Sequence, residues 1–190
     1  MGNGQTPSQT VGPYFTMRLA GEGGNVVATP DADGQRIRIE GVVYDGDRKP
    51  MEDAFIELWQ ANAAGRYAHP LDAGSPSDDF TGFGRCATDF HTGGYSFLTV
   101  KPGPVPHPDG SWQAPHVGLI IQSRGMLNAS FTRIYFSDCA DQNATDTVLA
   151  SVPEDRRSTL IGTLVDGDGV ATYRFDIRFQ GADETVFFDA

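Results

Sequence analysis

The side chains in this chain with the widest chemical repertoire are its four histidines and six tyrosines. The histidines, His69, His91, His107 and His116, stand at irregular separations, and they form neither an HExxH motif nor a spacing that places two histidines and a carboxylate together. No GxSxG motif marks a nucleophilic serine, and residues 82–84 (GFG) lack the lysine of a phosphate-binding loop. Residue types and spacing alone therefore point to no self-contained catalytic centre.

Charge and cysteine content exclude several classes of protein. The net charge of −11 leaves no basic surface for nucleic acid or for an anionic membrane. No segment approaches the roughly 18 apolar residues of a membrane span, and residues 1–7 are too polar for a secretion signal. We therefore expect a cytoplasmic protein in which Cys86 and Cys139 are reduced thiols, although the sequence leaves a disulfide between them open.

Alternating apolar and polar residues indicate that strands position whatever site there is. Near the C-terminus, Tyr173, Phe175, Ile177 and Phe179 alternate with polar residues, as in a half-buried strand. Similar patterns predict strands at residues 37–44, 54–60, 94–100, 117–122 and 131–136.

Two helices are expected at the edge of these strands. A capping-box pattern, Ser151 to Glu154, precedes Leu160, Ile161 and Leu164 and predicts one helix. A second short helix is expected over residues 146–150.

Short strands, frequent turns and one or two peripheral helices predict an all-β fold, a β-sandwich of mostly antiparallel strands. Residues 1–190 are expected to form a single domain. Residues 1–35 show little periodicity and are expected to form an extended arm that contacts a partner chain.

Several segments, in the same order along the chain, resemble the intradiol ring-cleaving dioxygenases. They span about residues 6–180, and the order of ELWQAN, GRY, YSF and KPGP is specific to that family. The segments are residues 10–15 (TVGPYF), 56–62 (IELWQAN), 65–67 (GRY), 88–89 (TD), 94–97 (GYSF), 101–104 (KPGP), 112–116 (WQAPH) and 132–136 (TRIYF).

The resemblance implies a ferric ion held by two tyrosine phenolates and two histidines, which activates an aromatic diol toward O₂. The ligand positions fall on Tyr67, Val105, His116 and Gly118, and an arginine of the family falls on Gln113. Valine and glycine offer no donor, so two ligands of four remain. The expectation is therefore that this chain binds no metal and has no catalytic residue of its own.

Some members of the family consist of two homologous chains, of which only the β chain binds iron. The resemblance therefore implies a non-iron-binding α subunit, with Fe(III) bound by a homologous β subunit in a larger hetero-oligomer. The enzyme would cleave 3,4-dihydroxybenzoate between its hydroxyl-bearing carbons to give 3-carboxy-cis,cis-muconate. Thr10, Gly12, Pro13 and Tyr14 of the arm are expected to line the substrate approach, or to dock the arm at the interface.

Arg133 is the other expected substrate-binding residue. In a strand it shares a face with Phe131 and Tyr135, so its charge needs an anionic partner. The substrate carboxylate is one candidate, and a structural Asp or Glu is the other. Two different functions also stay open: a β-sandwich binding module without an enzyme partner, and a self-sufficient dioxygenase that uses an unusual ligand such as His107.

Overall fold

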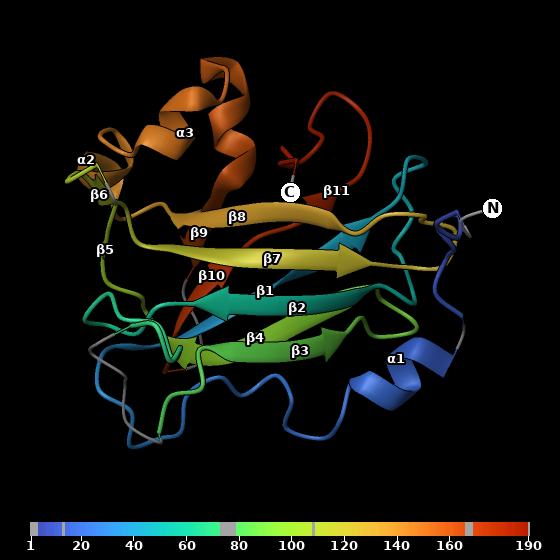
Figure 1. The fold of residues 1–190 in the computed structure, drawn as a ribbon, viewed down its shortest axis with the longest axis horizontal. Helices are drawn as coiled ribbons and strands as arrows, with labels where there is room; N and C mark the ends of the chain where they lie inside the picture. Colours follow the sequence, from blue (N-terminus) through green and yellow to red (C-terminus); the bar gives the residue numbers. More distant parts are fainter. Residues whose placement is uncertain (1–3, 13, 73–78, 108, 166–168, 190) are drawn as a thin grey trace.

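The computed structural model describes residues 4–12, 14–72, 79–107, 109–165 and 169–189. Strands dominate it (Figure 1). The first half of the chain holds α1 (Tyr14–Leu19), β1 (Arg36–Tyr44), β2 (Phe55–Gln60), β3 (Phe83–Ala87) and β4 (Gly94–Val100). The second half holds β5 (Val105–Pro106), β6 (Trp112–Gln113), β7 (His116–Gln122), β8 (Ser130–Phe136), α2 (Ala140–Asn143), α3 (Thr147–Ser151), the 3₁₀ helix η1 (Glu154–Leu160), β9 (Ile161–Val165), β10 (Ala171–Arg174) and β11 (Ile177–Arg178).

Within the described residues, nine strands form one curled sheet in the order β11-β1-β10-β9-β8-β7-β2-β3, with β4 on the other edge of β1. Most pairs are antiparallel; β1 pairs in parallel with β10 and β11, and β8 with β9. Figure 1 shows β8, β7, β2 and β3 as a front layer, with β1, β4 and β10 crossing behind it. The predicted β-sandwich of mostly antiparallel strands is confirmed, and β5 and β6 form a separate hairpin beside it.

The two layers enclose one main core. Ile37 and Ile39 of β1 are fully buried against Leu58 of β2, Leu119 of β7 and Ile134 of β8. Each such side chain contributes roughly 1.5–3 kcal/mol by leaving water. The opposite faces of β2, β7 and β8 carry partly exposed residues, and this outer face holds the candidate site.

The two expected helices have different outcomes. The helix predicted over residues 146–150 is confirmed as α3, whose N-cap, Asp146, accepts a hydrogen bond from the backbone of Leu149. A helix does follow Ser151, but it is the 3₁₀ helix η1, with Pro153 rather than Ser151 at its N-cap, and it ends at Leu160, so Ile161 and Leu164 belong to β9 and not to the helix. Strand β9 lies between β8 and β10, and the pairing with both strands outweighs the local helical pattern.

The first 35 residues are not simply extended. Helix α1 interrupts them, and the Phe15 ring packs edge-on against Phe55 at 5.0 Å between centroids. Val27 and Ala28 are buried in the chain's own core, so this part of the expected arm packs on its own domain. No described helix is long and apolar enough to cross a membrane. Cys86 and Cys139 are both free thiols.

Candidate functional site

A row of three residues crosses the outer face of the front layer. Trp59 of β2 is the register partner of Gly118 of β7, and Gly118 is in turn the partner of Arg133 of β8. Directly opposed residues of antiparallel strands share one face of the sheet. Gly118 therefore leaves a gap between an indole ring and a guanidinium group. A Cβ atom at Gly118 would meet only the Trp59 carbonyl oxygen, at 3.5 Å, which is ordinary contact.

The β5–β6 hairpin adds two more of the positions singled out in the sequence. Val105 and Gln113 are register partners in this hairpin, and Val105 is buried. Arg133 Nη1 donates a hydrogen bond of 2.8 Å to Gln113 Oε1. The ion pairs among the described residues include none to Arg133, so its contact within the chain is to a neutral amide rather than to a structural carboxylate.

Tyr67 lies in the loop after β2 and stacks on Trp59, with ring centroids 5.8 Å apart and planes 9° from parallel. The Asp72 carboxylate accepts a 2.9 Å hydrogen bond from the Tyr67 backbone N–H and so fixes the loop. A cavity of about 600 Å³ opens here, lined by Trp59, Arg66, Tyr67, His69, Leu71 and Asp72. Burial raises the pKa of the Tyr67 phenol, against the opposing effect of Arg133, so the phenol stays protonated at neutral pH.

His116 begins β7 opposite Tyr135 of β8 and is almost completely buried. Its Nδ1 lies 2.8 Å from the Ala114 carbonyl oxygen, a contact that requires a proton on Nδ1. Burial, together with the Arg133 guanidinium, lowers the pKa of His116. The ring is therefore neutral at pH 7, and its other nitrogen is free to accept a hydrogen bond.

Asp146 organises this end of the sheet and was missed as a site residue in the sequence. The side chain is buried, with 0% exposure. It accepts hydrogen bonds from the Tyr135 hydroxyl at 3.0 Å and from the backbone N–H groups of Ala114 at 2.8 Å and Leu149 at 2.7 Å. Only its role as the start of a helix had a signal in the sequence; the contacts to β8 and to the segment before His116 span long stretches of chain.

The residues at this site do not fit a ferric ion. Val105 and Gly118 supply no donor atom, and Tyr67 and His116 leave at most two ligands where a stable site needs three or four. The Arg133 guanidinium influences Tyr67 and His116 alike, so a cation would meet a positive charge where it needs donors. His107, the unusual ligand considered from the sequence, has its Nδ1 2.9 Å from Asp109 Oδ1, so this nitrogen already faces a carboxylate of its own loop. Among the described residues, no group of three or more His, Cys, Asp or Glu side chains could hold a metal.

The arm residues lie elsewhere. The Thr10 hydroxyl accepts a 2.7 Å hydrogen bond from the backbone N–H of Gly125, beyond the C-terminal end of β7. Tyr14 opens α1 and is 77% exposed, a Cβ at Gly12 would meet nothing within 4 Å, and Pro13 lies outside the described residues. The structure thus brings together the degenerate ligand positions and Arg133, but it does not bring the arm residues to them (Figure 1).

Comparisons with known proteins agree with this geometry. A family model described as a dioxygenase matches residues 10–181. The protocatechuate 3,4-dioxygenase alpha chain of Pseudomonas putida is 43% identical, over 97% of this chain and 96% of that protein. The alpha chain of Burkholderia cepacia is 42% identical, over 97% of both chains.

More distant proteins share the fold. The protocatechuate 3,4-dioxygenase beta chain of Burkholderia cepacia is 37% identical over 85% of this chain and 71% of its own length. The structure of catechol 1,2-dioxygenase from Acinetobacter sp. ADP1 superposes with a TM-score of 0.63 at 21% identity, covering 80% of this chain and 55% of that one. The chain therefore belongs to the intradiol ring-cleaving dioxygenase family, and over nearly its full length it is a homologue of the protocatechuate 3,4-dioxygenase alpha chains.

Proposed function

We propose that this chain is the non-iron-binding α subunit of a protocatechuate 3,4-dioxygenase. The enzyme would use O₂ to cleave 3,4-dihydroxybenzoate between its hydroxyl-bearing carbons, giving 3-carboxy-cis,cis-muconate. One observation carries the proposal: an alpha-chain homologue over nearly its full length has Val105 and Gly118 where two of four ligands belong. A chain that keeps the fold and lacks the ligands serves the reaction by completing another chain's pocket.

The partner in this proposal is a homologous β chain that binds the ferric ion, and the two chains form a higher hetero-oligomer in the cytoplasm. The likeness to the Burkholderia cepacia beta chain supports a partner of the same fold. When bound there, the iron supplies the Lewis acid that activates the diol. The residues of this chain would bind and orient the substrate and would limit the access of water.

Arg133 is the residue that we propose for the substrate carboxylate. A guanidinium has five N–H donors in a planar fork, and the hydrogen bond to Gln113 uses only one nitrogen of Arg133. The side chain is partly exposed on the outer face of β8. A neutral amide orients the fork without neutralising it, which favours an external carboxylate as its ionic partner.

For the arm, we propose that Thr10, Gly12, Pro13 and Tyr14 contact the partner's pocket. The open space around Gly12 and the exposed Tyr14 ring support a contact outside this chain, and Phe15 supplies the anchor on Phe55. Because Thr10 and Arg133 lie at different parts of the front layer, the arm must either move on association or serve a different pocket of the assembly from the one that Arg133 serves.

The proposal is tested by producing this chain alone and together with a homologous β chain. The chain alone should be colourless and inactive, with no iron by metal analysis. The co-purified complex should show the visible absorption of phenolate bound to ferric iron and should cleave 3,4-dihydroxybenzoate. An active, iron-containing preparation of this chain alone would overturn the proposal, and so would a native protein that elutes as a single small species without a partner.

A further inference from the structure

A second cavity lies away from the site described above, where two strands separate. Strand β10 pairs with β9 as far as Arg174 and then leaves it, because the backbone N–H of Phe175 donates to the Glu40 carbonyl of β1. Strand β11 then pairs with β1 alone. The space left between β9 and β11 is a cavity of about 350 Å³, within the usual size range of ligand sites.

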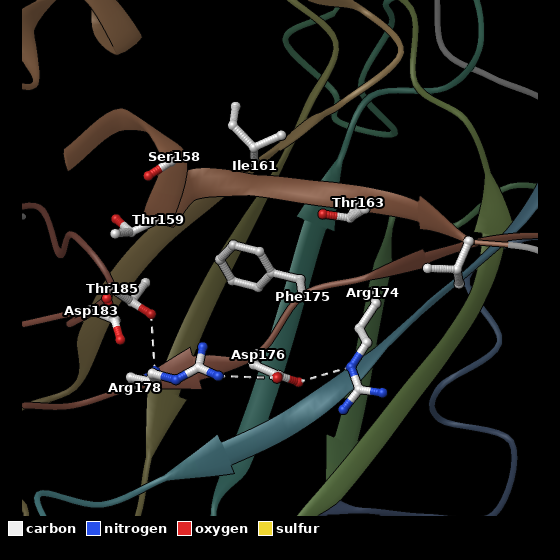
Figure 2. A pocket seen from close by; sticks show the side chains of 11 residues that line it. Ser158, Thr159, Ile161, Thr163, Arg174, Phe175, Asp176, Arg178, Asp183 and Thr185 are labelled. Atoms are coloured by element: carbon white, nitrogen blue, oxygen red, sulfur yellow. Dashed lines mark hydrogen bonds and ion pairs between the residues drawn. The ribbon is translucent and has the colours of Figure 1, made fainter. Parts of the chain in front are cut away.

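Two arginines stand at this cavity with one carboxylate between them (Figure 2). Asp176 Oδ1 lies 3.5 Å from Arg174 Nε, and Asp176 Oδ2 accepts a 3.3 Å hydrogen bond from Arg178 Nη2. The backbone N–H of Val42 also donates to Asp176 Oδ1, at 3.1 Å. Asp176 thus accepts from three groups and holds both guanidinium groups at one edge of the cavity.

Among the described residues, most donors of this pair have no partner. The contacts with Asp176 use one nitrogen of each guanidinium, out of the three that each carries. Hydroxyl groups of Ser158 and Thr163 line the cavity as further donors. Asp183 is the other described carboxylate in the lining and is exposed to solvent, where water weakens its influence. A ligand here therefore needs acceptor oxygens.

The remaining wall is apolar. Phe175 is buried and lies between the strands, near Ile161 of β9 (Figure 2). Val165 of β9 also lines the cavity. An inorganic anion would leave this wall without contacts. A carboxylate with a flat apolar body would place its oxygens on the guanidinium forks and its body against Phe175, which uses both halves of the cavity.

We propose that the cavity between β9 and β11 binds a small carboxylate with an apolar body, through Arg174 and Arg178. The site shares no residue with the Tyr67–Arg133 region and does not depend on the function proposed for that region. The cavity is thus a second candidate binding site for an aromatic carboxylate, separate from the one proposed at Arg133.

The test is calorimetric titration of benzoate and, separately, of acetate into the full-length chain. We expect saturable binding of one benzoate, with acetate weaker by about tenfold or more because its apolar body is missing. Arg174→Gln with Arg178→Gln should weaken benzoate binding by about tenfold or more, the loss expected for charge-assisted hydrogen bonds. Arg18→Gln with Arg48→Gln, the same change of charge at two exposed arginines outside the cavity, should leave it unchanged.

Two further variants separate the alternatives. Thr163→Phe keeps both arginines and fills the cavity from β9, so it should abolish binding even if the double arginine variant fails to fold. Arg124→Gln, a change at an exposed arginine outside the cavity, should have no effect on benzoate binding by this chain alone. The proposal is overturned by an absence of saturable binding, by equal affinity for acetate, by full binding in Thr163→Phe, or by loss of binding in Arg124→Gln.

Discussion

Arg133 lies directly opposite Gly118 across the antiparallel pair of β7 and β8, so the position that lacks a ligand side chain faces a fixed positive charge. The guanidinium is held by Gln113 from the neighbouring hairpin. A ferric ion placed at this site would therefore lack two donors and would also meet a positive charge that is part of the chain.

This relationship predicts how iron binding could be restored. Val105→Tyr with Gly118→His supplies the two missing donors, and Gly118 has room for a side chain. With Arg133 in place, however, the repulsion between a guanidinium and Fe(III) is on the order of several kcal/mol at the effective dielectric of a protein. We expect the double variant to stay colourless and the triple variant with Arg133→Gln to bind iron. Equal iron contents in the two, measured by metal analysis and visible absorption, would contradict the argument.

Arg133 also predicts a difference between substrates in the assembled enzyme. If its fork binds the carboxylate, Arg133→Ala should raise the KM for 3,4-dihydroxybenzoate by about tenfold to a hundredfold, from a loss of about 1.5–3 kcal/mol. The KM for catechol, which has no carboxylate, should change much less. Arg85→Ala, which removes a partly exposed arginine paired with Glu57, is the matched control. An equal loss for both substrates would assign Arg133 a structural role only.

A substitution at Gly12 tests the arm's role in assembly apart from its role in the fold. A Cβ atom there meets nothing in this chain, so Gly12→Val should change the free energy of unfolding of the isolated chain by less than about 0.5 kcal/mol. If the partner approaches this backbone closely, the same change should weaken association by about tenfold, as overpacking typically costs 1–3 kcal/mol. Gly4→Val, at an equally open glycine of the arm, is the control. Unchanged association in Gly12→Val would leave the arm without a contact at this point.

Asp146 predicts a large effect on stability. Asp146→Ala leaves the Tyr135 hydroxyl and the N–H groups of Ala114 and Leu149 without their acceptor in the interior. We expect a loss of about 3–5 kcal/mol in urea unfolding, because several buried donors are orphaned together. Asp141→Ala removes an exposed carboxylate from α2 and should change the stability by less than about 0.5 kcal/mol. A loss below about 1 kcal/mol for Asp146→Ala would show that water replaces the carboxylate.

The elements with a regular local pattern were the ones that the sequence could predict. Alternation at Tyr173, Phe175 and Ile177 places all three in the core, as expected. The pattern did not reveal that the strand divides into β10 and β11, since that break depends on a hydrogen bond from Phe175 to Glu40 of a distant strand. The overextended helix has the same cause: Ile161 and Leu164 suit a helical face, and only the pairing with β8 and β10 selects a strand after Leu160.

The residues of the candidate site were likewise predictable only in part. Tyr67, Val105, His116 and Gly118 were identified through the family resemblance, and the structure gathers them around Arg133. The expectation that Arg133 needs an anionic partner could not specify Gln113, because that contact joins residues 20 positions apart through a two-stranded hairpin. Asp146 was missed for the same reason, since its partner Ala114 is 32 positions away. Side-chain contacts between distant segments have no periodic signal in the sequence.

A half-buried ion pair on the far side of β8 gives a prediction about pH. Lys101 Nζ lies 2.6 Å from Asp138 Oδ2 and 5.4 Å from the ring centroids of both Phe136 and Tyr173, and the Tyr173 hydroxyl donates to the same carboxylate at 3.0 Å. Partial burial raises the pKa of Asp138, but the hydrogen bonds from Lys101 and Tyr173 outweigh it and leave the pKa lowered. For Lys101, partial burial lowers the pKa, and the bond to Asp138 outweighs it and leaves the pKa raised.

The directions of these two pKa shifts determine the pH range in which the pair of Lys101 and Asp138 stabilises the fold. Because the pKa of Asp138 is lower in the folded state, the unfolded chain binds the proton more readily, and the stabilisation is complete above about pH 4 and lost as the pH falls further. For Lys101 the stabilisation is complete below about pH 10 and lost above its raised pKa. Asp138→Asn should therefore cost about 1–2 kcal/mol at pH 7, and the difference from the unmodified chain should shrink between pH 4 and pH 3.

The control for this experiment is the exposed pair of Lys49 and Asp47, at 3.4 Å. Asp47→Asn should cost less than about 0.5 kcal/mol at any pH, because water and salt screen such a pair. Urea unfolding at pH 3, 4, 5 and 7 measures both variants against the same background of other titrating carboxylates, which cancels in the difference. If the cost of Asp138→Asn stays constant from pH 7 to pH 3, the carboxylate is not held in its charged form by Lys101, and the packing of Lys101 on Phe136 and Tyr173 must act without it.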